Sequence, residues 1–272
     1  MNMPRLAIAT AIAFLLGYSA ASQALATLPA VTSGLVAHYS FEGNASDESG
    51  NSNHGTVTGA VLTSDRNGLP NAACDFDANG DAVVVANSPS LNPPTAITVA
   101  AWYRPVSFGG TGSDPIVDKA FTSHSAPYYQ YHLSVTGNQY VNTPGSFGFS
   151  VATGGVNNSV NTPNNFWTAG NWYHVVGTYD STLASDNLAL YVNGSLIGTT
   201  SATGAIADYG QDLLIGKFGN LSNSLFGTID EVSIYNRALS FGEVQQIAGV
   251  PEPHSLILAV VGMLAFGLRR SR

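Results

Sequence analysis

Residues 188–198 read LALYVNGSLIG, and this stretch decides the fold class. Leu188, Leu190 and Val192 recur at every second position, which is the period of a β-strand. Asn193-Gly194 follows at once. An Asn-Gly pair between two apolar segments is the strongest short-range signal for a hairpin, because a type I′ turn needs positive φ at both central residues. The stretch therefore predicts two antiparallel strands joined by a tight turn.

Similar short segments recur through the middle of the chain, separated by Gly, Asn, Asp and Pro. Residues 136–165 are rich in Gly, Asn and Pro and are expected to be mainly long loops. There is no internal repeat and no linker, so the pattern predicts one all-β domain, a two-sheet antiparallel sandwich or jelly roll. The expected strands are residues 35–41, 82–85, 97–103, 131–135, 147–151, 172–179, 188–192, 195–198, 213–216 and 229–235.

Helix is expected at one place in the domain. Ser240 and Glu243 form a Ser-x-x-Glu capping box, which predicts a short helix over residues 241–248 that ends at Gly249.

The N-terminus has the pattern of a signal peptide. Arg5 precedes an apolar stretch from Leu6 to Leu16, and Ala24-Leu25-Ala26 forms an A-x-A cleavage site. Residues 1–26 are therefore expected to form a signal helix that is removed after Ala26. The protein is then exported, and the folded domain begins at residue 27.

The C-terminus carries a second targeting signal. Pro251-Glu252-Pro253 cannot continue a helix or a sheet, and it precedes an apolar run from Leu256 to Leu268 and a basic end, Arg269-Arg270-Ser271-Arg272. The run predicts a transmembrane helix with its arginines on the cytoplasmic side, although it is shorter than the usual ~20 residues. The alternative is an ordinary tail anchor.

This order of segments resembles the PEP-CTERM sorting tail of Gram-negative bacteria. The resemblance implies recognition of residues 250–272 by an exosortase-type membrane protease. A transient inner-membrane anchor would then be followed by transfer to the cell surface or release from the cell.

Charge and cysteine content restrict the functions of the domain. The chain has a formal net charge of −8 at pH 7, and residues 27–250 contain five basic and sixteen acidic side chains. That balance repels phosphate backbones, which argues against nucleic-acid binding. Cys74 has no second cysteine to pair with, so the domain has no internal disulfide, and Cys74 is expected to be a small buried hydrophobic residue.

Several segments in a fixed order resemble the LamG-like jelly-roll domain of the concanavalin A-like lectin/glucanase superfamily. The likeness covers about residues 33–249 and implies two curved antiparallel sheets with loops around one face. Because this superfamily includes lectins, enzymes and adhesion modules, the fold does not decide the function. The segments are residues 34–43, 47–55, 76–81, 97–102, 171–180, 190–194 and 226–240.

The resemblance also implies a structural Ca²⁺ on the side away from the ligand face. Asp230 matches the coordinating aspartate at the start of the last long strand, and backbone carbonyls would come from Glu42 or Gly43 and from Asn79 or Gly80. Carboxylate and carbonyl oxygens are the ligands that calcium prefers. The alternative is that Asp230 caps a turn by hydrogen bonding.

A second oxygen-rich run, from Asp47 to Asn53, begins like an EF-hand loop. The twelfth position is Thr58, however, so the bidentate glutamate is missing and a turn is the favoured interpretation.

No catalytic constellation is evident. Glycoside hydrolysis needs two acids facing one cleft, but Asp230 and Glu231 are adjacent on an expected strand and should point to opposite faces. The histidines are scattered, and neither a nucleophile motif nor a zinc spacing is present. We therefore expect a protein that is not an enzyme.

Aromatic residues in polar loops are the best indication of a ligand. Tyr128, Tyr129, Asn165 and Trp167 could form a platform for a sugar ring, whereas Trp102 and Trp172 lie in strand patterns and are expected in the core. The favoured interpretation is a non-catalytic module for carbohydrate binding or adhesion, acting on extracellular polysaccharide or another glycan. A structural matrix protein without a small ligand and a divergent glycosidase are the alternatives.

Overall fold

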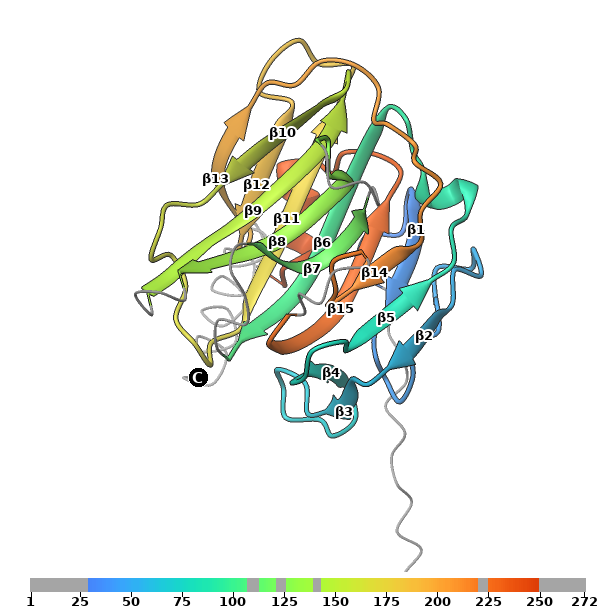
Figure 1. Cartoon of the computed structure of the whole chain (residues 1–272), viewed down its shortest axis with the longest axis vertical. Helices are drawn as coiled ribbons and strands as arrows, with labels where there is room; N and C mark the ends of the chain where they lie inside the picture. Colours follow the sequence, from blue (N-terminus) through green and yellow to red (C-terminus); the bar gives the residue numbers. More distant parts are fainter. Residues whose placement is uncertain (1–28, 107–112, 121–125, 139–142, 220–224, 250–272) are drawn as a thin grey trace, which may run out of the picture.

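The computed structural model describes residues 29–106, 113–120, 126–138, 143–219 and 225–249 (Figure 1). Within these residues two antiparallel sheets pack face to face, and one short α-helix follows the last strand. The predicted all-β sandwich is confirmed. The expected signal helix and transmembrane helix lie outside the described residues. Among the described helices, none is both long and apolar enough to span a bilayer.

Sheet A has the strand order β13-β12-β11-β6-β15-β4-β3, and β1 pairs with β15 beside this path. Its strands are β1 (Leu35–Tyr39), β3 (Val61–Thr63), β4 (Ala73–Phe76), β6 (Ala96–Pro105), β11 (Tyr173–Asp180), β12 (Leu188–Val192), β13 (Ser195–Thr200) and β15 (Gly227–Tyr235).

Sheet B has the strand order β10-β9-β8-β7-β14-β5-β2. Its strands are β2 (Gly55–Thr58), β5 (Ala82–Val85), β7 (Ser113–Ala120), β8 (Tyr129–Asn138), β9 (Thr143–Thr153), β10 (Val156–Asn161) and β14 (Leu213–Ile215). A 3₁₀ turn, η1 (Pro89–Leu91), precedes β6.

The main core lies between the sheets and follows the two-residue period of the strands. Val99, Ala101 and Tyr103 of β6 face Leu133 of β8 and Phe149 of β9 across the interface, and all five are buried. Each intervening residue on these strands must point to an outer face. Cys74 is fully buried in this core, as predicted, and burial raises the pKa of its thiol to about 12.

A second apolar cluster lies on the outer face of sheet A, where α1 (Phe241–Ile247) packs. Val244 of the helix is completely buried in it. The predicted capping box is confirmed, because the Ser240 side chain accepts from the Glu243 amide while the Glu243 carboxylate accepts from the Ser240 amide. The cluster comprises Val31, Leu35, Ala100, Val176, Ala189, Tyr191, Tyr235, Leu239 and Val244.

The predicted hairpin is also confirmed, since Asn193 (φ 51°) and Gly194 (φ 74°) join β12 to β13. The expectation of mainly loops over residues 136–165 is wrong, because this region contains the long strand β9 and the edge strand β10. Only Val160 is buried on β10, so its sequence VNNSVN carries little apolar alternation.

The close approach of the two sheets gives a stability prediction. Gly177 lies in the middle of β11, and a Cβ at this position would be 2.0 Å from Cγ of Phe149 in sheet B. We expect Gly177→Ala to lower the free energy of unfolding by ~1–3 kcal/mol in urea denaturation, as overpacking does. Gly242→Ala is the control, because that Cβ meets nothing within 4 Å in α1; it should raise stability by up to ~1 kcal/mol. Equal stabilities for the two variants would contradict this packing.

Candidate functional site

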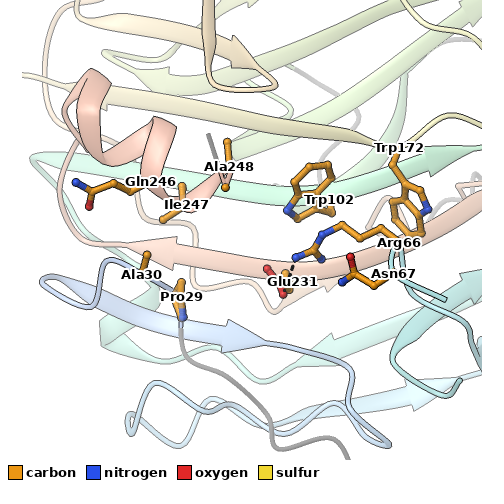
Figure 2. Close-up of a pocket in the computed structure, with 11 residues that line it drawn as sticks. Pro29, Ala30, Arg66, Asn67, Trp102, Trp172, Glu231, Gln246, Ile247 and Ala248 are labelled. Atoms are coloured by element: carbon orange, nitrogen blue, oxygen red, sulfur yellow. Dashed lines mark hydrogen bonds and ion pairs between the residues drawn. The ribbon is translucent and has the colours of Figure 1, made fainter. Parts of the chain in front are cut away.

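A pocket of about 540 Å³ opens on the outer face of sheet A, beside the end of α1 (Figure 2). Both ends of the folded domain contribute to its wall. We call it the tryptophan–arginine pocket. It is lined by Pro29, Ala30, Arg66, Asn67, Trp102, Trp172, Glu231, Gln246, Ile247, Ala248 and Gly249.

The two tryptophans occupy positions that the sequence interpretation assigned to the core. Ala101 and Tyr103 face the main core, so Trp102 between them points outward, and Trp172 lies just before β11. Both indoles are half-buried. The expected core placement is therefore wrong, because the period of β6 puts Trp102 on the opposite face from its buried neighbours.

Each indole has an arginine above it. The guanidinium carbon of Arg66 is 4.7 Å from the Trp102 ring centroid, and that of Arg104 is 5.3 Å from the Trp172 centroid. Such cation–π contacts hold the arginine and the ring in fixed positions.

Arg66 also binds two carboxylates. Its Nη1 is 2.6 Å from Asp230 Oδ2, and its Nη2 is 3.0 Å from Glu231 Oε1. These acids share one side of the sheet because Glu231 adopts φ 47° at a register shift in β15. The expectation that Asp230 and Glu231 face opposite ways is thus wrong, since a β-bulge breaks the alternation.

Burial governs the charges around Arg66. The Asp230 side chain is 3% exposed, and desolvation, reinforced by Glu231, raises its pKa to about 7 despite the opposing attraction of Arg66. The nearby His174 ring, 5.1 Å from that of Trp102, has its pKa lowered to about 3 by burial and by Arg66. His174 is therefore neutral at pH 7.

One buried donor in the pocket has no partner. The indole Nε1 of Trp102 makes no hydrogen bond within the described part of the chain. Figure 2 shows this nitrogen on the side of the ring that faces Ile247 and Ala248, two residues of the pocket wall. Buried polar groups are normally paired, so this covered, unpaired donor in the wall of a cavity is a candidate partner for a ligand acceptor.

The residues expected to bind calcium do not fit that role. The carboxylate of Asp230 is already held by Arg66. Glu42 is close enough to Glu231 for that charge to help raise its pKa, after desolvation, Asp65 and Glu48. Gly80, however, follows the far end of β4, whose Phe76 pairs with Gly227 rather than with Asp230. Within the described residues, no group of three or more Asp, Glu, His or Cys side chains could hold a metal.

The run from Asp47 to Asn53 forms a turn, as favoured from the sequence. The Asp47 carboxylate accepts hydrogen bonds from the amides of His38, Ser49 and Asn53 and from the Ser49 hydroxyl. Because four donors occupy the Asp47 carboxylate oxygens, these oxygens stabilise the local turn rather than bind a metal.

Tyr128 and Tyr129 belong to an aromatic group on sheet B, which we call the tyrosine cluster (Tyr128, Tyr129, His132 and Phe218). The Tyr129 and His132 rings are parallel with centroids 4.3 Å apart, and Phe218 meets both edge-on. His132 Nδ1 lies 2.8 Å from Asp118 Oδ1, and both of these residues are buried.

Asn165 and Trp167 do not join that cluster. The neighbouring Phe166 amide donates to Gly145 at the start of β9, whereas Tyr129 lies at the opposite end of the β8–β9 pair. Trp167 is 2% exposed and packs in the main core, while Asn165 (φ 60°) is at an exposed turn. The four residues expected to form one platform are therefore not brought together: the two tyrosines are neighbours, Asn165 is at a separate exposed turn, and Trp167 fills the core.

Sequence reasoning missed Arg66 and the two tryptophans as site residues. Two signals could have indicated them. Arg66 is one of only five basic side chains in residues 27–250, and Trp102 has the opposite parity to the apolar series of β6.

Comparison with known sequences decides the family. The sequence model of the concanavalin A-like lectin/glucanases superfamily matches residues 77–245. The chain belongs to this superfamily. Residues 249–271 match the PEP-CTERM protein-sorting motif, so both resemblances are confirmed. The motif marks an exported protein that is processed at the membrane by an exosortase. No curated protein matches the chain.

Several solved structures of other proteins share the fold of this chain. The binding domain of Paraclostridial Mosquitocidal Protein 1 is 19% identical, with a TM-score of 0.61 over 80% of this chain and 52% of that one. Domain 4 of AbnA, a GH43 arabinanase from Geobacillus stearothermophilus solved with arabinotriose, is 19% identical, with a TM-score of 0.59 over 79% and 98%.

Botulinum neurotoxin type C, whose cell entry depends on two ganglioside molecules, is 13% identical, with a TM-score of 0.58 over 82% of this chain and 52% of that one. The chain thus spans about half the length of the mosquitocidal and neurotoxin structures. At these identities the likeness establishes the fold alone.

The buried Asp230 predicts a pH dependence of stability. Its pKa is about 7 in the folded state and ~3.9 when unfolded, so the folded state binds more protons between these values. The contribution of Asp230 is complete below pH ~4 and is lost as pH rises toward 7. Asp230→Asn should flatten the decline of stability across this interval in urea denaturation. A decline as steep as that of the wild type would contradict the assignment.

Calcium binding can be tested directly by thermal melting. A resident ion would raise the midpoint by mass action. Because Arg66 already binds the Asp230 carboxylate, we expect the melting midpoint to be the same after complete chelation and after addition of millimolar Ca²⁺. A calcium-dependent rise that disappears in Asp230→Ala would restore the site implied by the family resemblance.

Proposed function

We propose that the protein is an exported, non-catalytic carbohydrate-binding domain that holds a glycan in the tryptophan–arginine pocket. The observation that carries this proposal is a cavity lined by two indole rings, with Trp102 Nε1, buried and unpaired among the described residues, in its wall. Arg66 and His174 already contact the Trp102 ring, whereas Trp172 has Arg104 on one face, so the other face of Trp172 would stack on the C–H groups of a sugar ring. The Trp102 Nε1 donor would bind a ring or hydroxyl oxygen once a ligand displaces the atoms that cover it.

The polar lining suits a neutral sugar. Arg66 and Asn67 supply amide and guanidinium donors on one side, and Glu231, with its side chain 29% exposed, supplies an acceptor. A volume of about 540 Å³ is within the ~300–1,000 Å³ typical of ligand pockets. Because one guanidinium offsets at most one of the two carboxylates that it binds, the pocket has no surplus positive charge with which to select an anionic ligand.

The geometry argues against hydrolysis. A glycosidase needs two carboxyl groups with separate roles, either ~5 Å apart or more widely spaced around a water. Here Asp230 and Glu231 are joined by one guanidinium, and Asp230 is nearly inaccessible. Two structural neighbours support a carbohydrate ligand: the AbnA domain was solved with arabinotriose, and botulinum neurotoxin type C depends on gangliosides.

The PEP-CTERM motif and the proposed signal peptide support an activity outside the cytoplasm. The N-terminal segment is proposed to be a signal peptide of a Gram-negative bacterium, removed after Ala26. After exosortase processing the domain would bind extracellular polysaccharide at the cell surface or in the matrix.

A glycan array tests the function. The full chain, purified in mild detergent, should bind a subset of neutral glycans, and Trp172→Ala should weaken the best of them at least ~10-fold, equivalent to ~1.4 kcal/mol. Phe241→Ala is the control, because Phe241 is a 50% exposed aromatic of α1 outside the pocket.

Two results would contradict the proposal. One is a folded wild type that binds no glycan above background, which would favour a matrix protein without a small ligand. The other is release of reducing sugar from a bound polysaccharide, which would establish a glycosidase.

A further inference from the structure

We propose that the tyrosine cluster is a second glycan-binding site, and that the protein cross-links two polysaccharide chains. This inference rests on the proposed function of the tryptophan–arginine pocket. It adds a second site of the same ligand class on the opposite side of the molecule.

The two sites face in opposite directions. Tyr131 and Leu133 of β8 point into the main core, so His132 between them points to the outer face of sheet B. Trp102 points to the outer face of sheet A for the same reason. Figure 1 shows β7, β8 and β9 in front of β6 and β11, with α1 behind them. The whole core therefore separates the cluster from the pocket.

The tyrosine cluster is held rigidly from three neighbouring strands. Asp118 comes from β7, His132 from β8, and Phe218 follows β14, and these strands are adjacent in sheet B. Asp118 fixes the His132 ring, and Tyr129 stacks on that ring. A sugar would meet preformed rings, so little ordering would oppose binding.

The exposed part of the cluster has the chemistry of a sugar platform. Tyr128 is 42% exposed, and its ring centroid is 6.1 Å from that of the half-buried Tyr129. Two phenol rings in this arrangement offer apolar faces and hydroxyl groups together.

The strands beside the cluster are also suited to a neutral ligand. Ser150 is paired with His132 across β8 and β9, and Ser134 follows on the same face of β8. The Asp118 carboxylate is matched by His132. Ser134 and Ser150 are uncharged but largely buried, so the two tyrosines supply the contacts, which suit a neutral sugar better than a charged partner.

Simultaneous occupation of both sites needs two glycan chains. Two packed sheets are ~10 Å apart, and the sites lie beyond the outer face of each, so a short glycan bound at one cannot reach the other. One protein molecule with a different glycan chain at each site would bridge the two chains.

A bead-aggregation experiment tests the bridge. Latex beads coated in parallel with arabinan, dextran or xylan are mixed with the full chain in mild detergent, and protein retained and turbidity are both measured. Wild type should be retained and should aggregate the beads. Tyr128→Ala and Trp172→Ala should each be retained, with aggregation reduced at least tenfold. The double variant should lose both, and Phe241→Ala should resemble wild type.

Each outcome separates the two proposals. Full aggregation by Tyr128→Ala would overturn the second site, because the beads would then be bridged without it. The same result would exclude a dimer that bridges the beads through its tyrosine clusters. Loss of all retention by Trp172→Ala alone would leave the pocket as the single site and overturn bivalency. If wild type is retained on none of the three coatings and on no array glycan, the proposed function fails, and bivalency with it.

Discussion

The two-residue period of the strands is the constraint on which the rest of this structure depends. Without a disulfide, the domain is held by two apolar sheet faces pressed together, and residues such as Tyr103 and Phe149 must point inward to build that core. Their neighbours are then obliged to point outward. Trp102 on one sheet and His132 on the other are therefore placed on outer faces by the packing of residues beside them. The candidate sites are consequences of how the core is filled.

A β-bulge in β15 interrupts this period and creates the charge arrangement of the pocket. The bulge at Glu231 brings two adjacent acids to one guanidinium, which also covers Trp102. Bulges re-aim side chains near functional sites in many sheets. Here one guanidinium holds both acids at the position where the family resemblance implied a bound Ca²⁺. Asp230 remains buried with a raised pKa, so its ionisation costs stability as the pH rises.

Much of the fold could be predicted from the sequence, but the site could not. The Asn193-Gly194 turn, the Ser240–Glu243 capping box and most strands are local patterns, and local patterns are visible in one dimension. Strand β10 was missed because an edge strand buries few side chains. The pocket depends on contacts across the chain, such as the pairing of Arg66 with Asp230 at 164 residues' separation. The alternation of β6 could predict that Trp102 points outward. The cavity beside Trp102 could not be predicted, because its wall includes residues of the helix packed on the outer face. Trp167 was misplaced because a loop aromatic can equally fill the end of a core.

The wall of the tryptophan–arginine pocket includes Pro29 and Ala30 at one end of the domain and Ala248 and Gly249 at the other. The PEP-CTERM motif begins at residue 249, and the proposed leader cleavage after Ala26 lies just before Pro29. The proposed ligand site is thus assembled from both ends of the folded domain, and loss of a few residues at either end would remove part of its wall while leaving both sheets intact. Affinity handles or fluorescent reporters fused directly at these ends would obstruct the cavity.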